Sequence, residues 1–359
     1  MRILVVTGSS GGHIFPALAL MEKLKDSGQE AVLLVPKKEG GADIPVPGDR
    51  VIYMHGGRLG LPFNRRNLTE FFSLFRGGWE SLRAVLKFKP DVVVGFGSLD
   101  TVAAVFWAWL FRTRTVIHEQ NVICGRANKF LSKIADKVAV SFAQTGKYLD
   151  IAEDKIILTG NPLRKEMTPP DKKEARDFFR LKEDAFTVLI TGGSQGSHRL
   201  NDACLKAFSA CGNKDAFQVI HICGRHDFSR LRSGYDDAKV ECRLFSFCAD
   251  MRYAYGAADL VVSRAGATTV AELARFKVPA LLVPYPYAYA HQNANADILA
   301  EAGAAVVIQD WQFKPEMLLY YLSGFLEDRR KLELMRRGYV NLGREDAVGM
   351  LARVVLNPG

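Results

Sequence analysis

The chain has 359 residues, more than one compact core usually spans, so we expect two domains. Hydrophobic residues make up 48% of it and charged residues 24%, which excludes a disordered chain and fits a globular enzyme. The formal net charge of +9 favours an anionic partner, and most of the excess lies between Val51 and Lys137. No run of lysine and arginine is long enough for a nucleic-acid-binding arm, so no nucleic-acid partner is expected.

The six cysteines show neither a C-x-x-C pair nor a zinc-site spacing, which predicts small buried side chains in a reducing compartment. The first residues indicate a strand that enters a glycine turn rather than a signal peptide. The longest apolar run, Val102 to Phe111, is about half of what a membrane-spanning helix needs. We therefore expect a protein that is cytosolic or that lies on a membrane without crossing it.

Short β-branched runs alternate with helical patterns along the chain, which predicts parallel sheets built from β-α-β units. Helices are predicted at Pro16–Ser27 and Leu68–Lys87. The first series of strands is predicted at Ile3–Thr7, Glu30–Pro36, Asp91–Gly95, Thr115–His118 and Lys137–Ser141. The second is predicted at Thr187–Thr191, Gln218–Cys223, Ala258–Ser263, Pro279–Pro284 and Ala304–Ile308. Each series opens with a strand, a glycine turn and a helix, so two Rossmann-like halves are expected, with a hinge near Gly160–Arg164.

The first glycine turn runs from Thr7 to His13. Its glycines let the backbone turn tightly and approach an anion, and the following helix offers free N–H groups. Ser10 breaks the G-x-G-x-x-G spacing, and Val35–Lys38 stands where a dinucleotide-binding fold carries an acidic residue, so a dehydrogenase is disfavoured. The alternative is a tight turn without a ligand. His13 could act as a general base as a neutral imidazole, or could be a capping or packing histidine.

A second glycine turn covers Thr191–Ser197, and a third segment, Ser263–Glu272, joins a strand to a helix through Gly266. The first N–H groups of that helix can bind a diphosphate. Glu272 falls about one turn further on, where its carboxylate could accept hydrogen bonds from both hydroxyls of a ribose. The alternative is a capping box formed by Thr269 and Glu272.

Two further segments carry polar side chains suited to a sugar or a phosphate. His291 and Gln292 follow an aromatic, proline-containing loop and could bind sugar hydroxyls. Arg164 closes the hinge, where its guanidinium could bind a phosphate or form a surface salt bridge.

The predicted helix Leu68–Lys87 carries large apolar residues on one face at helical spacing. Such a stripe either packs on its own sheet or lies in an anionic membrane surface, with the arginines along its edge facing lipid head groups. Phe106, Trp107, Trp109 and Phe111 would extend it. The candidates for membrane contact are Phe71, Phe72, Phe75, Trp79, Arg76 and Arg83.

Taken in chain order, these motifs resemble the MurG family of peripheral membrane glycosyltransferases, in glycosyltransferase family 28. The resemblance is carried by the turn with His13, by His118-Glu119-Gln120-Asn121, Gly160-Asn161-Pro162-Leu163-Arg164, Gly192-Gly193-Ser194-Gln195-Gly196, Arg264-Ala265-Gly266-Ala267 with Glu272, and His291-Gln292. It spans nearly the whole chain.

The resemblance implies an α/β fold of the GT-B type, with two Rossmann-like domains whose parallel sheets face a central cleft. Residues 1–160 would form an acceptor- and membrane-facing domain, with a C-terminal helix at about 344–359 packed back on it, and residues 161–343 a UDP-GlcNAc-binding domain. The implied reaction is the inverting transfer of N-acetylglucosamine from UDP-GlcNAc to the 4-hydroxyl of lipid I, giving lipid II in peptidoglycan synthesis.

The implied partners are UDP-GlcNAc, lipid I and the anionic cytoplasmic face of the bacterial cell membrane, with other cell-wall and division proteins as further candidates. No cofactor and no metal ion are expected. His13 is the candidate catalytic base. The resemblance implies donor contacts at Ser10, Gly11, Gly12, Asn121, Arg164, Ser194, Cys248, Ala267, Thr268, Thr269, Val270, Ala271, Glu272 and Gln292.

One segment departs from the family pattern. Gly95–Thr101 carries Asp100 where a loop that faces a lipid diphosphate would not be expected to hold an acidic residue. The acceptor could therefore be a different lipid, such as diacylglycerol. The motifs are also compatible with a nucleotide-sugar epimerase of the same architecture and with a non-catalytic nucleotide-sugar-binding module.

Overall fold

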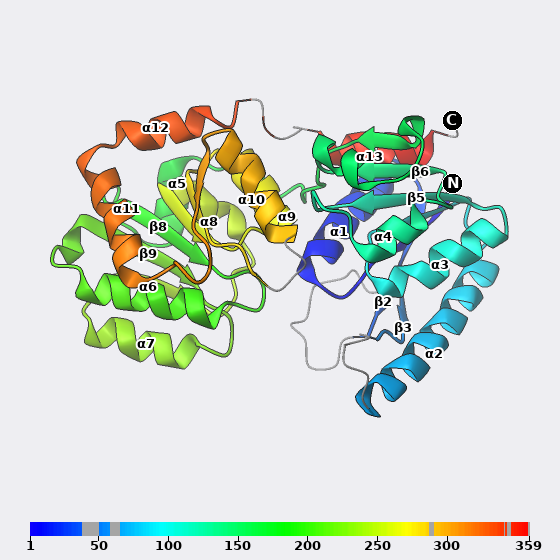
Figure 1. Ribbon diagram of the computed structural model, residues 1–359, viewed down its shortest axis with the longest axis horizontal. Helices are drawn as coiled ribbons and strands as arrows, with labels where there is room; N and C mark the ends of the chain where they lie inside the picture. The colour runs from blue at the N-terminus through cyan, green and yellow to red at the C-terminus, as the bar shows by residue number, and fades with distance from the viewer. Residues whose placement is uncertain (38–49, 58–64, 287–290, 341, 343–345, 358–359) are drawn as a thin grey trace. The chain divides into compact units, whose positions relative to one another are not determined.

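The computed structural model describes residues 1–37, 50–57, 65–286, 291–340, 342 and 346–357. For residues 65–71 it describes the backbone but not the side chains. The chain divides into two compact units (Figure 1). The first comprises Met1–Arg164 together with Arg344–Gly359, and the second comprises Lys165–Gly343. The predicted α/β class, with a parallel sheet in each half, is confirmed.

The described part of the first unit contains a seven-stranded sheet in the order β3-β2-β1-β4-β5-β6-β7, and all of its strand pairs are parallel. Its strands are β1 (Arg2–Val6), β2 (Glu30–Pro36), β3 (Val51–Met54), β4 (Val92–Gly95), β5 (Arg114–Glu119), β6 (Lys137–Val140) and β7 (Ile156–Leu158). Its α-helices are α1 (Gly11–Asp26), α2 (Arg65–Phe88), α3 (Leu99–Leu110), α4 (Arg126–Leu131) and α13 (Ala347–Leu356).

Both faces of this sheet are covered, which explains why its central strands are apolar at successive positions. Ile3 and Val5 point to the core formed with α1 and α13, while Leu4 and Val6 point to the core formed with α2, α3 and α4. The last helix, α13, packs against α1, and Arg114 donates hydrogen bonds to the carbonyl groups at its end. The C-terminal segment is therefore part of the first unit.

The second unit repeats the plan with a parallel sheet that, over the described residues, has six strands in the order β10-β9-β8-β11-β12-β13. These are β8 (Phe186–Thr191), β9 (Phe217–Ile222), β10 (Cys242–Phe245), β11 (Leu260–Ser263), β12 (Ala280–Leu282) and β13 (Ala305–Val307). The α-helices are α5 (Lys172–Phe178), α6 (His198–Ala210), α7 (Phe228–Asp237), α8 (Met251–Ala257), α9 (Ala267–Phe276), α10 (His291–Glu301), α11 (Pro315–Glu327) and α12 (Arg330–Arg337).

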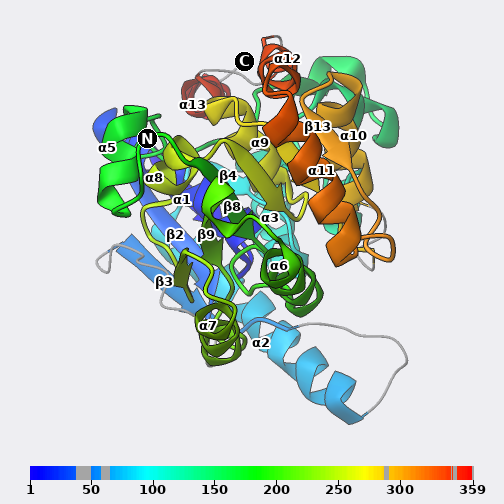
Figure 2. The same cartoon turned by 90° about the vertical axis from the view of Figure 1, so that its left-hand side faces the viewer.

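Helix α2 packs on its unit through small residues rather than through its aromatic stripe. A Cβ on Gly77 would lie 2.0 Å from the carbonyl oxygen of His55, and Gly78 accepts a hydrogen bond from Trp107 Nε1 of α3. Phe75 and Trp79 are exposed, at 72% and 58% of their surface. The interpretation that the stripe packs on its own sheet is therefore wrong, and the N-terminal end of α2 projects beyond that sheet (Figures 1 and 2).

The six cysteines are all free, and Cys124, Cys204, Cys223 and Cys248 are buried as expected. Over the described residues, no helix is both long enough and apolar enough to cross a membrane. Helix α1 begins five residues before the predicted start at Pro16, so that this proline lies inside the helix. This earlier start places His13 in the first turn.

Candidate active site

The predicted site residues of the first unit gather at the carboxyl edge of its sheet, where the ends of parallel strands meet. Ser10 caps α1, with φ −85° and ψ 148°, and its side chain makes no capping hydrogen bond. Gly11 and Gly12 form the first helical residues, whose N–H groups have no acceptor within the helix. Asn121 follows β5 and Arg164 follows β7, so both reach the same edge.

His13 is held by a side chain 107 positions away. Its Nδ1 lies 2.9 Å from Oε1 of Gln120, which is buried directly after β5. Nε2 of Gln120 lies 3.0 Å from Nδ1 of His118, and Nε2 of His118 lies 3.1 Å from the carbonyl oxygen of Gly160. A continuous row of hydrogen bonds therefore joins the start of α1 to the end of β5 and to the hinge.

His118 is completely buried, and this burial lowers its pKa to about 4. The neighbouring Glu119 and the hydrogen bond to Gly160 oppose that shift, and His13 adds to it. His118 is consequently a neutral imidazole at physiological pH. Sequence reasoning assigned no role to Gln120 or His118, although their spacing of two at a strand end places them on the same side of the sheet.

Asp100, the acidic residue that departs from the family pattern, forms hydrogen bonds that hold neighbouring loops. One carboxylate oxygen accepts a hydrogen bond from the backbone N–H of Gly57 at 3.2 Å, and the other accepts one from the Ser98 hydroxyl at 2.9 Å. Ser98 has φ 78° and ψ 152°, a backbone region that is normally limited to glycine. A Cβ on Gly8 would lie 2.5 Å from that of Ser98. Asp100 thus holds the loops after β3 and β4 together beside the turn that carries His13.

Glu119 organises the loop that carries Asn121. Its buried carboxylate accepts hydrogen bonds from the backbone N–H groups of Asn121 and Gly125, at 2.9 and 3.0 Å, and from the side-chain amides of Asn121 and Asn128. Arg164 places its guanidinium over the ring of Phe15, 4.7 Å from the centroid. This cation–π contact orients Arg164 along α1, so the described contacts do not show the surface salt bridge that the sequence left open.

In the second unit, the turn after β8 depends on glycines that permit close backbone contacts. Gly196 has φ 77°, and a Cβ there would lie 2.0 Å from the carbonyl oxygen of Cys223. A Cβ on Gly192 would lie 2.4 Å from the backbone nitrogen of Ser197. The turn is therefore pressed onto the end of β9, and the side chain of Ser194 at its tip is exposed.

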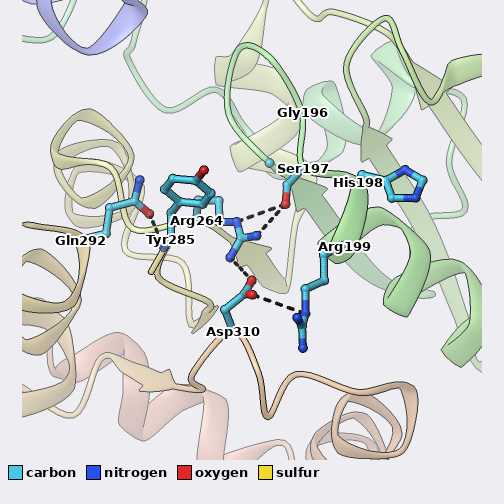
Figure 3. Close-up of a pocket in the computed structure, with 9 residues that line it drawn as sticks. Gly196, Ser197, His198, Arg199, Arg264, Tyr285, Gln292 and Asp310 are labelled. Carbon is cyan, nitrogen blue, oxygen red and sulfur yellow. Dashed lines mark hydrogen bonds and ion pairs between the residues drawn. The ribbon is translucent and has the colours of Figure 1, made fainter. Parts of the chain in front are cut away.

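A polar cavity of about 470 Å³ lies beside this turn, within the second unit. The guanidinium of the buried Arg264 donates hydrogen bonds to Asp310 at 2.6 Å and to the Ser197 hydroxyl at 2.7 Å (Figure 3). Arg199 binds the other oxygen of Asp310 at 3.3 Å, and the ring of Tyr285 lies beside Arg264. Loops that follow β8, β11, β12 and β13 are fixed to one another by these contacts.

Gln292 is the one predicted donor-site residue that lines this cavity. Its Oε1 accepts hydrogen bonds from the backbone N–H groups of Ala265 and Tyr285, at 3.1 and 2.9 Å. The oxygen therefore joins two strand-end loops, and the Nε2 amino group is the part of the side chain that can reach a ligand.

The segment Ala267–Glu272 forms the first turns of α9, and Gly266 is the residue before the helix. Thr269 is thus the third helical residue, so the capping-box interpretation is wrong. Oε2 of Glu272 accepts a hydrogen bond of 2.8 Å from the hydroxyl of Tyr255. Burial, followed by the charge of Glu272, raises the pKa of Tyr255 well above its usual value, so this hydroxyl stays protonated and acts as a donor.

Cys248 lies after β10 and is buried, and this burial raises its pKa to about 11. It is a neutral thiol, suited to packing rather than to nucleophilic attack. Within the described ranges, no cluster of three or more His, Cys, Asp or Glu side chains could hold a metal ion.

The chain matches two family models over most of its length. Residues 3–140 match the glycosyltransferase family 28 N-terminal domain, and residues 187–348 match the C-terminal domain of the same family. The chain belongs to glycosyltransferase family 28. The predicted family is thereby confirmed.

Curated relatives in this family share the full length of the chain. A Desulforamulus reducens protein is 34% identical over 99% of this chain and 98% of its own length, and a Coxiella burnetii protein is 34% identical over 97% and 96%. Both are named UDP-N-acetylglucosamine–N-acetylmuramyl-(pentapeptide) pyrophosphoryl-undecaprenol N-acetylglucosamine transferase.

Solved structures agree with the GT-B prediction. Acinetobacter baumannii MurG superposes with a TM-score of 0.74 at 26% identity, covering 99% of each chain. The UDP-GlcNAc 2-epimerase from Neisseria meningitidis superposes with a TM-score of 0.70, covering 99% of this chain and all of that one. Its identity is only 15%, so it shares the fold alone.

Proposed function

We propose that this chain transfers N-acetylglucosamine from UDP-GlcNAc to the 4-hydroxyl of lipid I, giving lipid II in peptidoglycan synthesis. The observation that carries the proposal is the near-full-length relationship, at 32–34% identity, to proteins named as that transferase. An epimerase function has no comparable support, because the epimerases resemble this chain in fold only.

The second unit is proposed to bind the donor. The first N–H groups of α9 would bind the diphosphate, where the positive end of the helix dipole favours negative charge. Glu272 would accept hydrogen bonds from the ribose hydroxyls, with Tyr255 holding its other oxygen. Ser194 would contact a phosphate, Cys248 would pack beside the base, and Gln292 would reach the sugar through Nε2.

The first unit is proposed to bind the acceptor and to supply the base. The acceptor 4-oxygen attacks the anomeric carbon, the bond between that carbon and the diphosphate oxygen breaks, and UDP leaves with the electron pair. The proton of the 4-hydroxyl passes to His13, and configuration at the anomeric carbon inverts. The start of α9 after Gly266 and the guanidinium of Arg164 would stabilise the charge that develops on the diphosphate.

A transfer assay tests this function directly. Purified protein should release UDP from UDP-GlcNAc only when a lipid I analogue is present, and the product should contain one additional N-acetylglucosamine. Turnover with diacylglycerol instead would favour a different lipid acceptor. UDP release without any acceptor would indicate an epimerase, and binding of UDP-GlcNAc without turnover would indicate a binding module.

The first unit is further proposed to lie peripherally on the cytoplasmic face of the cell membrane. Phe72, Phe75 and Trp79 are 64%, 72% and 58% exposed on α2, and Trp109 and Phe111 are exposed at the end of the neighbouring α3. Arg76 and Arg83 are exposed on the same helix and can meet anionic head groups. Phe71 lies outside the described side chains. Such a surface is suited to a lipid acceptor and to other cell-wall and division proteins.

Vesicle sedimentation tests the membrane proposal. The double variant Phe75→Ser/Trp79→Ser should bind vesicles containing anionic lipid at least tenfold more weakly than the parent, because each ring contributes apolar area. The matched control is Trp311→Ser/Tyr320→Ser, which removes two rings of comparable exposure from the second unit. Equal losses for both double variants would contradict a specific membrane face.

A further inference from the structure

The amide of Gln120 occupies a buried position between two imidazoles. It is 1% exposed, and it contacts His13 through one atom and His118 through the other. Its amino group also faces backbone carbonyl oxygens, while its oxygen faces His13. Its orientation therefore decides what His13 can do.

The hydrogen-bond partners of Gln120 determine which way its amide faces. Nε2 lies 3.2 Å from the carbonyl oxygen of Phe96 and 3.1 Å from that of His118. Carbonyl oxygens only accept hydrogen bonds, so the amino group must face them. The reversed amide would place its oxygen against two other oxygens. Oε1 consequently faces Nδ1 of His13, at 2.9 Å.

An amide oxygen can only accept, so Nδ1 of His13 must carry the hydrogen. A neutral imidazole has one N–H, which leaves the lone pair on Nε2. We propose that Gln120 is a positioning residue that holds His13 in the Nδ1–H tautomer and thereby makes Nε2 the atom that accepts the proton of the acceptor 4-hydroxyl. This inference rests on the proposed role of His13 as the base.

His118 and Gly160 fix the direction in which the hydrogen bonds of this row are donated. The Gly160 carbonyl accepts from Nε2–H of His118, so Nδ1 of His118 is free to accept from the Gln120 amino group. Burial lowers the pKa of His118 to about 4, so the direction does not reverse at working pH. The ionisable groups on the described elements around His13 include His118 and Glu119 at the end of β5, Asp100 at the start of α3, Arg126 and Lys129 on α4, and Arg164 over Phe15.

The same arrangement persists during the reaction. When Nε2 takes the proton from the 4-hydroxyl, the imidazolium still donates its Nδ1–H to Gln120, so no hydrogen bond has to be exchanged. Groups that orient metal-ligating histidines typically contribute a factor of about 10 to 100 in affinity or activity, and we expect a similar factor for Gln120. Loss of Gln120 should therefore lower kcat without changing the affinity for UDP-GlcNAc.

Nitrogen NMR of ¹⁵N-histidine-labelled protein tests the tautomer without any turnover. The His13 signals are identified as those that His13→Ala removes from the seven histidines of the chain. Wild-type protein should show a protonated Nδ1 and an unprotonated Nε2 at neutral pH. A protonated Nε2 with an unprotonated Nδ1 at His13 would overturn the inference, and this test requires only that His13→Ala folds well enough to assign the signals.

Gln120→Met, which is similar in size, removes the acceptor. We expect the Nε2–H tautomer to appear and kcat to fall by about 10- to 100-fold, with the KM for UDP-GlcNAc unchanged within twofold. The matched control Gln144→Met alters an exposed glutamine of the same unit and should leave both kinetic constants at wild-type values.

A double-mutant comparison separates positioning from general support of the fold. If Gln120 acts through His13, then Gln120→Met should cause little further loss in a His13→Ala background. An equal fold-loss in both backgrounds would refute the positioning role. Absence of transfer by the wild-type protein would instead refute the proposed function, and the NMR result would still decide the tautomer.

Discussion

The polar groups that meet around His13 are linked through neutral side chains, whereas those that meet around Arg264 are linked through charged ones. In the first unit the hydrogen bonds run through the Gln120 amide to the His118 imidazole. In the second they run through the Asp310 carboxylate to the guanidinium of Arg199. Both groups lie at the carboxyl edge of a parallel sheet. Each of the two units also opens with a strand, a glycine turn and a helix.

This difference shows that the position of the polar side chains and their charge have separate causes. The repeated plan determines where polar side chains gather, because all strand ends of a parallel sheet share one edge. It does not determine their charge. A row of neutral groups can set which nitrogen of His13 carries the hydrogen, while a buried ion cluster fixes the loops around the cavity of the second unit. Loss of His13 or Gln120 should therefore act mainly on kcat, and loss of a charge from the cluster around Arg264 should act mainly on stability.

The largest effect is expected for His13→Ala. Removal of a general base should lower kcat by about 10²- to 10⁴-fold, because the 4-hydroxyl then has no acceptor for its proton. The affinity for UDP, which is proposed to bind in the second unit, should not change. Steady-state kinetics and calorimetry measure the two quantities, and an unchanged kcat would remove the base assignment.

Asp310→Ala should give the next largest effect, on stability. The variant leaves the buried Arg264 without its carboxylate, and breaking a buried ion pair typically lowers the free energy of unfolding by about 3–5 kcal/mol. The control Glu333→Ala breaks an exposed pair with Arg336 and should lower it by less than about 1 kcal/mol. Denaturant unfolding compares them, and similar losses would show that the cluster around Arg264 does not stabilise the cavity.

A pH effect should follow from His118. Its folded pKa of about 4 lies below the usual 6.5, so the unfolded chain takes up the proton first as pH falls. The stabilising contribution is complete above pH 6.5 and is lost as pH falls toward 4, by on the order of 3 kcal/mol. Unfolding measured from pH 7 to pH 4.5 should show a shallower pH dependence in His118→Asn. An identical slope would contradict the assignment of His118 as a buried neutral imidazole.

Glu272→Ala should show the smallest effect of the four, on the affinity for UDP. Hydrogen bonds to a charged group contribute about 1.5–3 kcal/mol, so the Kd should rise by roughly 10- to 100-fold. Glu301→Ala changes an exposed carboxylate of the same unit and serves as the control. Calorimetric titration with UDP measures both, and an unaltered Kd for Glu272→Ala would exclude the ribose role.

The central strands could be predicted from sequence because they are buried on both faces. The prediction for β2, Glu30–Pro36, matches at both ends. The strands that were missed, β3, β7 and β10, all lie at sheet edges, are partly exposed and contain only three or four residues. The edge strand β13 was nevertheless predicted, because it lies within the longer apolar run Ala304–Ile308.

Candidate site residues could be named where a local motif marks them, as at His13 and Gly266, and their roles stay predictions. Their partners could not be named, because those contacts depend on tertiary structure. Gln120 is 107 positions from His13, and Asp310 is 46 positions from Arg264. Asp100 was unexpected for a similar reason, because Gly57, which donates a hydrogen bond to its carboxylate, lies 43 positions away on another loop.

The glycine pair in α2 prevents that helix from rolling about its own axis. Turning the helix to bury Phe75 and Trp79 would replace Gly77 with a side chain, and a Cβ at that position already lies only 2.0 Å from the His55 carbonyl oxygen. The protein in free solution therefore has no alternative rotation that would hide these rings. A surface that covers these rings will therefore meet a face whose orientation is already set.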